Sequence, residues 1–183
     1  MPNLLGLRSI YLKTDAELAS CVHDVQDPES SDTMADESFQ QEFLDTHNDY
    51  RRTHGAPPLT LNSDLCAAAQ KWANHIASIN TLQHSSTKDG ENIYYASSSN
   101  PIKLTGKEAV ENWYGEIKDY QWDQPGFNMN TGHFTQVVWK DSTELGVGQA
   151  SNGNSVFVVG QYRPAGNMNV AGYFEKNVLP SSV

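Results

Sequence analysis

The chain of 183 residues has the length of one ordinary domain with room for a tail. Its hydrophobic fraction of 38% and its charged fraction of 19% are too apolar for a wholly disordered chain and too polar for a membrane channel. The formal net charge of -10 argues against the basic face with which nucleic-acid-binding proteins neutralise phosphates. We therefore expect a globular protein without a nucleic-acid partner.

The first 38 residues differ in composition from the rest of the chain. They carry two basic and eight acidic side chains, and residues 14–38 hold few large apolar groups. Such a segment buries too little apolar surface to offset the entropy of ordering. We expect a disordered acidic leader over residues 1–38 and one domain over residues 39–183. Arg8 and Lys13 interrupt the apolar start of the chain, which predicts that no signal peptide is present.

Only two cysteines occur, Cys21 in the leader and Cys66 in the domain. The domain by itself therefore has no pair of cysteines to join. We expect both thiols to be reduced, and a chain of this kind is typical of a reducing compartment.

Apolar residues at helical spacing predict three helices, over residues 39–54, 63–80 and 105–117. The second helix follows a plausible cap at Asn62 or Ser63. The third begins at Thr105, and Glu108 three residues later completes a capping box.

Beyond Asp119 the pattern changes to short β-type runs at residues 134–139, 145–148 and 156–162. The last run is apolar on both faces and so predicts a central strand. Because the intervals between the runs are too short for crossover helices, we expect the strands to pair antiparallel. The sequence predicts an α/β sandwich in which helices cover a mostly antiparallel sheet.

Four ionisable residues lie at positions where a buried strand or helix would disfavour them: His84, Glu91, Glu116 and His133. Two imidazoles and two carboxylates could form a divalent metal site or an acid/base pair. They could equally form a satisfied buried polar network. His84 and His133 are 49 residues apart, unlike any local metal-binding motif, so spacing alone does not unite them.

Four segments resemble the signatures of the CAP superfamily, the cysteine-rich secretory, antigen 5 and pathogenesis-related 1 proteins. They are Gly-His-Phe-Thr-Gln-Val-Val-Trp at 132–139, His-Asn-x-x-Arg at 47–51, Gly-Glu-Asn at 90–92, and Phe-Val-Val-Gly-Gln-Tyr-Arg-Pro-Ala-Gly-Asn at 157–167. Residues 116–120, 124–127 and 175–180 are similar to the cysteine-poor Golgi-associated branch of this family. The likeness covers about residues 39–179.

The resemblance implies a three-layer α-β-α sandwich with a mostly antiparallel central sheet. It also implies a central cleft in which His84, Glu91, Glu116 and His133 form a tetrad. In that picture the two histidines bind a divalent metal, usually zinc, while the glutamates orient a water or complete the ligand set. Gly160 stands where the family's fourth signature usually has a disulfide-forming cysteine, a departure that the cysteine-poor intracellular branch accommodates.

The other polar residues of the signatures, and His54 of the first predicted helix, are expected to hold the fold together rather than to bind ligands. They are His47, Asn48, Arg51, His54, Asn92 and Asn167.

Three classes of function remain open. The resemblance favours a non-enzymatic module that binds an apolar lipid, either a sterol or a fatty acid, and a divalent metal in the His/Glu cleft. The second class is a zinc-dependent hydrolase with Glu91 or Glu116 as base, for which no nucleophile elbow or other catalytic signature is present. The third is an interaction scaffold that forms a homodimer without a small-molecule ligand.

The segment from Tyr120 to Phe127 places aromatic side chains on an irregular loop. We expect lipid binding there to depend on Trp122 and Phe127 and to be insensitive to salt. Cysteine-poor relatives associate with anionic membranes, which an acidic chain would repel, so peripheral membrane contact is left open. The expected location is the cytosol or the cytosolic face of Golgi membranes, with an extracellular location, as for most of the family, as the alternative.

Overall fold

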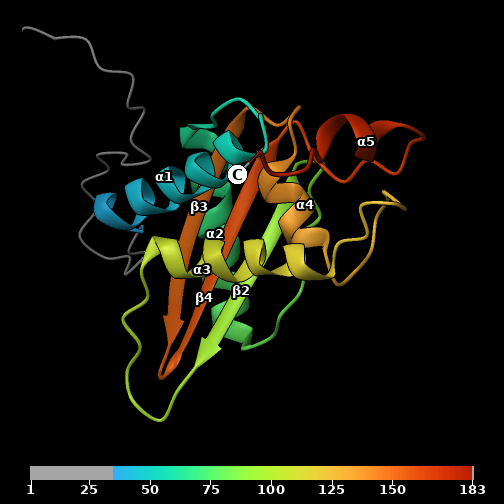
Figure 1. Cartoon of the computed structure of the whole chain (residues 1–183). Helices are drawn as coiled ribbons and strands as arrows, with labels where there is room; N and C mark the ends of the chain where they lie inside the picture. The colour runs from blue at the N-terminus through green and yellow to red at the C-terminus, as the bar shows by residue number, and fades with distance from the viewer. Residues whose placement is uncertain (1–34, 183) are drawn as a thin grey trace, which may run out of the picture.

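A four-stranded sheet lies between two helical layers in the computed structural model, which describes residues 35–182 (Figure 1). The strands are β1 (Thr60–Leu61), β2 (Gly90–Ser97), β3 (Glu144–Asn152) and β4 (Ser155–Arg163), in the order β1-β3-β4-β2. β4 pairs antiparallel with both β2 and β3, and only the short β1 pairs parallel, with β3. The three-layer α-β-α sandwich with a mostly antiparallel sheet is confirmed.

The helices are α1 (Glu37–Thr53), α2 (Ser63–Ile79), α3 (Gly106–Tyr114), α4 (Gly132–Val138) and α5 (Tyr173–Asn177), and a 3-10 helix, η1 (Gly115–Asp119), continues α3. The predicted caps are present. Asn62 accepts a hydrogen bond from the Leu65 backbone at the start of α2, and Thr105 and Glu108 form the capping box of α3. Local side-chain chemistry therefore fixes where these two helices begin.

Each face of the sheet has its own apolar core. α1, α3 and α4 pack on one face, where Phe43, Trp113 and Trp139 are fully buried. α2 covers the other face and packs against Phe157 and Val159 of β4. Residues 156–162 of β4 are all buried, which confirms the prediction of a central strand.

Two glycines of β3 allow α2 to lie close to the sheet. A Cβ added at Gly146 would lie 2.3 Å from the carbonyl carbon of Leu65, and one at Gly148 would lie 2.3 Å from the Cα of Gln70. Any side chain at these positions would push the helix away from the strand.

The prediction of a strand over residues 134–139 is wrong, because residues 132–138 form α4. The backbone N–H groups of His133 and Phe134 donate to Oε2 of Glu116, at 3.0 and 3.1 Å. This carboxylate satisfies N–H groups that the first turn of a helix leaves without a partner. Because Glu116 lies in η1, the interaction that favours a helix here is tertiary. It outweighs the β propensity of the aromatic and β-branched residues.

The sequence interpretation also missed β1, β2 and α5. β2 contains Ile93, Tyr94 and Tyr95, residue types that favour strands, and this was a usable signal. Most of the expected leader lies outside the described residues, and its last two residues, Glu37 and Ser38, belong to α1.

Cys66 is fully buried in α2 and is disulfide-bonded, so the expectation of a reduced thiol is wrong at this position. The cysteine count therefore no longer supports a reducing compartment.

Candidate functional site

The first half of the candidate site is a hydrogen-bonded pair between His84, in the loop after α2, and Glu91 of β2. Nδ1 of His84 lies 2.8 Å from Oε1 of Glu91. The carboxylate also accepts hydrogen bonds from the backbone and hydroxyl of Ser85 and from Nε2 of Gln161. The Glu91 side chain is only 4% exposed, whereas that of His84 is 65% exposed. Glu91 is thus a fixed anchor that orients an accessible imidazole.

The electrostatics of this pair favour a charged carboxylate. Burial by itself raises the pKa of Glu91, but hydrogen bonds from His84 and Ser85 outweigh it and hold the pKa below its ordinary value. The same contact with Glu91 raises the pKa of His84, although partial burial opposes this.

The second half is the pair between His133, in the first turn of α4, and Glu116 of η1. Nδ1 of His133 lies 2.7 Å from Oε1 of Glu116, while Oε2 accepts the two backbone N–H groups described above. The His133 ring also stacks on Trp113, with ring centroids 6.1 Å apart. Both the position and the orientation of this imidazole are therefore fixed.

The two pairs meet at one cleft of about 290 Å³. It is lined by His84, Glu91, Asn92, Phe127, Met129, Gly132, His133 and Asn167. Glu116 does not line the cleft itself but holds His133 from behind. The fold thus brings both histidines, which are distant in the sequence, to the same cavity.

Each of the two imidazoles uses Nδ1 for its glutamate, and Nε2 of neither makes a hydrogen bond with the described residues. A carboxylate that accepts from Nδ1–H leaves the Nε2 lone pair ready to bind a metal ion. No group of three or more His, Cys, Asp or Glu side chains among residues 35–182 forms a ready-made metal centre. His84 and His133 are the residues that could each offer one imidazole nitrogen to an ion in the cleft.

The two residues expected to bind lipid lie in different surroundings. Phe127 is 51% exposed and lines the cleft. Trp122 does not line it; its ring stacks on His54 and meets the edge of Phe134. The structure therefore brings Phe127, and not Trp122, to the histidine pair.

Two asparagines shape the cleft wall, and Met129 forms part of its rim. Asn92 donates to the carbonyl of His133 and to the hydroxyl of Tyr162, while Asn167 donates to the carbonyl of Gly132 and accepts from Thr135. These are the loop-fixing roles expected for both residues. Met129, 85% exposed, was not identified from the sequence, although its place beside Phe127 was a signal.

The chain is similar to proteins of one family. The sequence profile of the CAP, or Cysteine-rich secretory protein, family matches residues 44–162. The chain is 46% identical over 151 residues to the human "Golgi-associated plant pathogenesis-related protein 1", covering 80% of this chain and 96% of that protein. It is 35% identical to "Pathogenesis-related protein 1C" of Nicotiana tabacum, covering 72% and 79% of the two chains. It spans only 37% to 55% of three fungal relatives.

Among solved structures, that of NaASP2 with Zn²⁺ is 25% identical, with a TM-score of 0.62, and the match covers 76% of this chain and 86% of that one. The family profile spans α1 to β4, the part of the chain that carries both histidine–glutamate pairs. The chain therefore belongs to the CAP, or cysteine-rich secretory protein, family.

Proposed function

We propose that this protein is a non-enzymatic binding module whose cleft holds a divalent, zinc-like cation through His84 and His133 and takes an apolar lipid at its rim. One observation carries the proposal. Two imidazoles, each held at Nδ1 by a glutamate, line a single cleft with Nε2 free of protein hydrogen bonds.

Imidazole nitrogen is a preferred ligand of zinc, and a carboxylate hydrogen-bonded to the other ring nitrogen fixes both the tautomer and the orientation of the imidazole. The similarity to NaASP2, which was crystallised with Zn²⁺, supports this choice of ion. A bound ion would supply positive charge to a cleft that already contains the Glu91 carboxylate. Because only two side chains offer ligands, we expect binding to be weaker than at a structural zinc site, which has four.

The lipid part of the proposal depends on the apolar side of the cleft. Phe127 and Met129 both line it and are both exposed. Apolar surface of this kind, rimmed by polar groups, commonly marks a ligand site. No Lys or Arg lines the cleft. Attraction to anionic head groups therefore does not drive the proposed binding.

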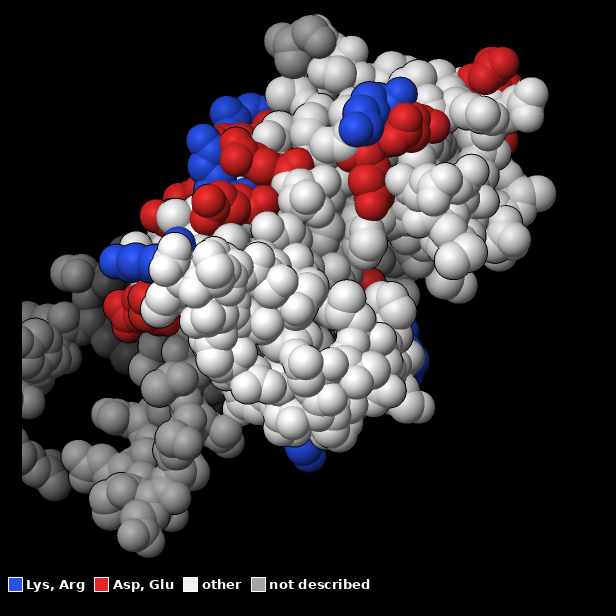
Figure 2. Space-filling view, turned by 90° about the horizontal axis from the view of Figure 1, so that it is seen from below, with Lys and Arg blue, Asp and Glu red and all other residues white. Residues whose placement is uncertain are grey.

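The distribution of charged residues on the surface agrees with lipid binding that does not depend on charge. On the face seen in Figure 2, the basic residues are scattered among acidic ones and gather in no basic patch. Within residues 35–182, no helix is long and apolar enough to cross a bilayer. We propose Golgi association, after the name of the human relative, through apolar contact rather than charge.

Zinc titration by calorimetry tests the metal site. We expect one ion per wild-type chain and no binding in the His84→Ala/His133→Ala double variant, while His75→Ala, an exposed histidine of α2, binds as the wild type does. Equal stoichiometry in the double variant would contradict the metal proposal. Metal-dependent turnover of an ester or peptide would favour the hydrolase instead.

A sterol- and palmitate-binding assay tests the lipid site. Phe127→Ala and Met129→Ala should each weaken saturable binding, whereas Tyr95→Ala, an exposed aromatic of β2, should not. Raising the salt concentration should leave the affinity unchanged. Absence of saturable uptake, together with a mass that rises with protein concentration, would support the homodimeric scaffold.

A further inference from the structure

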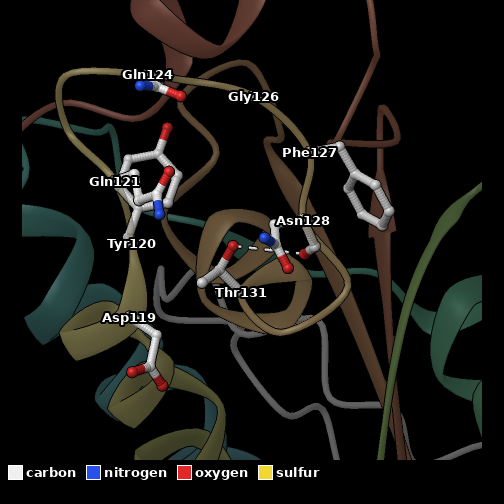
Figure 3. Close-up of a pocket in the computed structure, with 8 residues that line it drawn as sticks. All are labelled: Asp119, Tyr120, Gln121, Gln124, Gly126, Phe127, Asn128 and Thr131. Carbon is white, nitrogen blue, oxygen red and sulfur yellow. Dashed lines mark hydrogen bonds between the residues drawn. The ribbon is translucent and has the colours of Figure 1, made fainter.

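A second pocket lies within the loop that connects η1 to α4. It has a volume of about 180 Å³ and is lined by Asp119, Tyr120, Gln121, Gln124, Gly126, Phe127, Asn128 and Thr131 (Figure 3). Ligand pockets for drug-sized molecules have roughly 300–1,000 Å³. This pocket therefore suits a molecule about the size of one small ring with its substituents.

The hydroxyl of Tyr120 is the unusual group in this pocket. Tyr120 is 7% exposed, its hydroxyl oxygen is buried, and no described residue accepts a hydrogen bond from its proton. In Figure 3 the ring points toward the side chain of Gln124 across the pocket. A buried polar group without a partner costs free energy, and such groups are rare in folded proteins. A ligand that hydrogen-bonds with this hydroxyl would remove that cost.

The protonation state of the Tyr120 hydroxyl limits which ligands can hydrogen-bond with it. Burial raises the pKa of Tyr120, and the nearby amide of Gly126 offsets this only in part. The phenol is therefore protonated at neutral pH and can both donate and accept a hydrogen bond. A partner with hydroxyl groups matches it, because a hydroxyl also does both.

The rest of the lining excludes several kinds of ligand. No Lys or Arg lines the pocket and the Asp119 carboxylate does, so an anion would be repelled. Asp119 is the only carboxylate there, which is too few for a tightly bound hard cation. A wholly apolar ligand would displace water from the amides of Gln121 and Gln124 without replacing its hydrogen bonds.

We propose that this pocket binds a neutral sugar ring, either a free monosaccharide or the end of a glycan, through the Tyr120 hydroxyl and the surrounding amides. Amide side chains present a donor and an acceptor side by side, which suits neighbouring sugar hydroxyls. The pocket does not contain the histidine pair, although Phe127 lines both the pocket and the histidine cleft. The inference therefore does not depend on the metal proposal.

The test measures amide chemical shifts of the whole chain while methyl glycosides of glucose, galactose, mannose and N-acetylglucosamine are added up to 50 mM. We expect shifts confined to about residues 119–131 for at least one glycoside. Tyr120→Phe should weaken that binding at least fivefold and leave the melting temperature unchanged or higher, because it removes only an unpartnered hydroxyl. Tyr173→Phe, at an exposed tyrosine outside the pocket, is the matched control.

A second pair of variants lies in the same loop. Gln124→Ala should weaken binding, and Asp123→Ala, whose side chain does not line the pocket, should not. A comparison of free sugars with methyl glycosides, whose anomeric oxygen is blocked, distinguishes a free monosaccharide from the end of a glycan. A glycan end is favoured if the methyl glycosides bind as tightly as the free sugars.

Two results would overturn the proposal. One is the absence of shifts in residues 119–131 with any sugar at 50 mM. The other is unchanged binding by Tyr120→Phe; if that variant also melts at a lower temperature, the hydroxyl has a structural role. The zinc titration is unaffected by either result, so failure here is distinguishable from failure of the proposed metal site.

Discussion

Four histidines of the domain fall into two groups that differ in how their ring nitrogens are used. His47 and His54 are buried and have both nitrogens bonded: His47 to the Phe43 carbonyl and the Tyr162 hydroxyl, and His54 to the Leu179 carbonyl and the Tyr114 hydroxyl. His84 and His133 are partly exposed and use one nitrogen each. A histidine with both nitrogens satisfied holds the fold, whereas one with a free nitrogen on a cleft can take a ligand.

Arg51 is the clearest member of the interior network to which His47 belongs. Its guanidinium is fully buried and donates to the carbonyls of Pro57, Val137, Trp139 and Ser142, between 2.8 and 3.0 Å. These bonds join α1 to the loop that follows it, to the C-terminal end of α4 and to the loop between α4 and β3. Burial lowers the pKa of Arg51 to about 10, so it remains charged at neutral pH.

We expect the largest effect from Arg51→Ala, which would remove four hydrogen bonds to carbonyls in the interior. The free energy of unfolding, measured by urea denaturation, should fall by about 4 kcal/mol or more. Arg52→Ala is the matched control, because its pair with Asp49 is exposed and should be worth less than about 1 kcal/mol. Equal losses in the two variants would show that the interior network is not what stabilises this region.

The second prediction concerns pH and His47. Burial lowers the pKa of His47 to about 3, against 6.5 for an ordinary histidine. Between these values the unfolded chain binds a proton that the folded chain does not, so stability falls as the pH falls below about 6.5. The slope from this one group is at most about 1.4 kcal/mol per pH unit. Urea denaturation between pH 4 and 7 measures it.

The variant His47→Gln should flatten this slope while lowering stability at neutral pH. His54, whose pKa burial also lowers, contributes in the same direction. His84 has the opposite sign: its pKa is raised, so its stabilisation is present at low pH and is lost as the pH rises through the folded value. A steep slope that persists in His47→Gln would assign the effect to other groups.

Asn92 links the two regions, since it bonds both to the carbonyl of His133 and to the hydroxyl of Tyr162. Asn92→Ala should cost about 1–3 kcal/mol, because it removes buried hydrogen bonds to the carbonyl of His133 and to the hydroxyl of Tyr162. It should also weaken zinc binding, since the backbone that carries His133 loses a support. Asn100→Ala, in an exposed loop, should change neither quantity. A destabilised variant that binds zinc normally would show that the regions are independent.

The smallest effect should come from the cleft histidines themselves. Single variants His84→Gln and His133→Gln should each change the free energy of unfolding by less than about 1 kcal/mol without metal, because both side chains are partly exposed. With zinc present, the wild type should gain stability that neither variant gains. A loss of unfolding free energy as large as that of Arg51→Ala would show that His84 and His133 hold the fold together, as His47 and His54 do.

Features that depend on interactions between neighbours in the sequence are predictable from the sequence, and features that depend on distant contacts are not. The caps at Asn62 and Thr105 and the apolar run of β4 are local patterns, and each lies where it was expected. The prediction of a strand over residues 134–139 fails because the helix over residues 132–138 depends on the carboxylate of Glu116 and on packing against several elements. No local pattern contains that information.

In the candidate site, too, local residue chemistry is readable from the sequence, whereas the positions of the side chains depend on the tertiary structure. Residue chemistry alone selected His84, Glu91, Glu116 and His133, and the family resemblance joined them. Only the tertiary structure shows that His84, Glu91 and His133 line the cleft while Glu116 lies behind it. It also shows that Trp122 packs on His54 while Phe127 faces the cleft, although both are aromatic residues of one loop. Side-chain direction in an irregular loop is set by neighbours far away in the sequence.

By itself, the sequence determined the helix caps, the central strand, the sandwich architecture and the residue types that a metal or lipid site would need, because these depend on periodicity and on side-chain chemistry. The tertiary structure alone decided which ring nitrogens remain free, which aromatic side chain reaches the cleft, and where the Tyr120 hydroxyl is buried without a partner. The physical reason is that burial and hydrogen-bond satisfaction depend on contacts between distant segments, which exist only once the chain has folded.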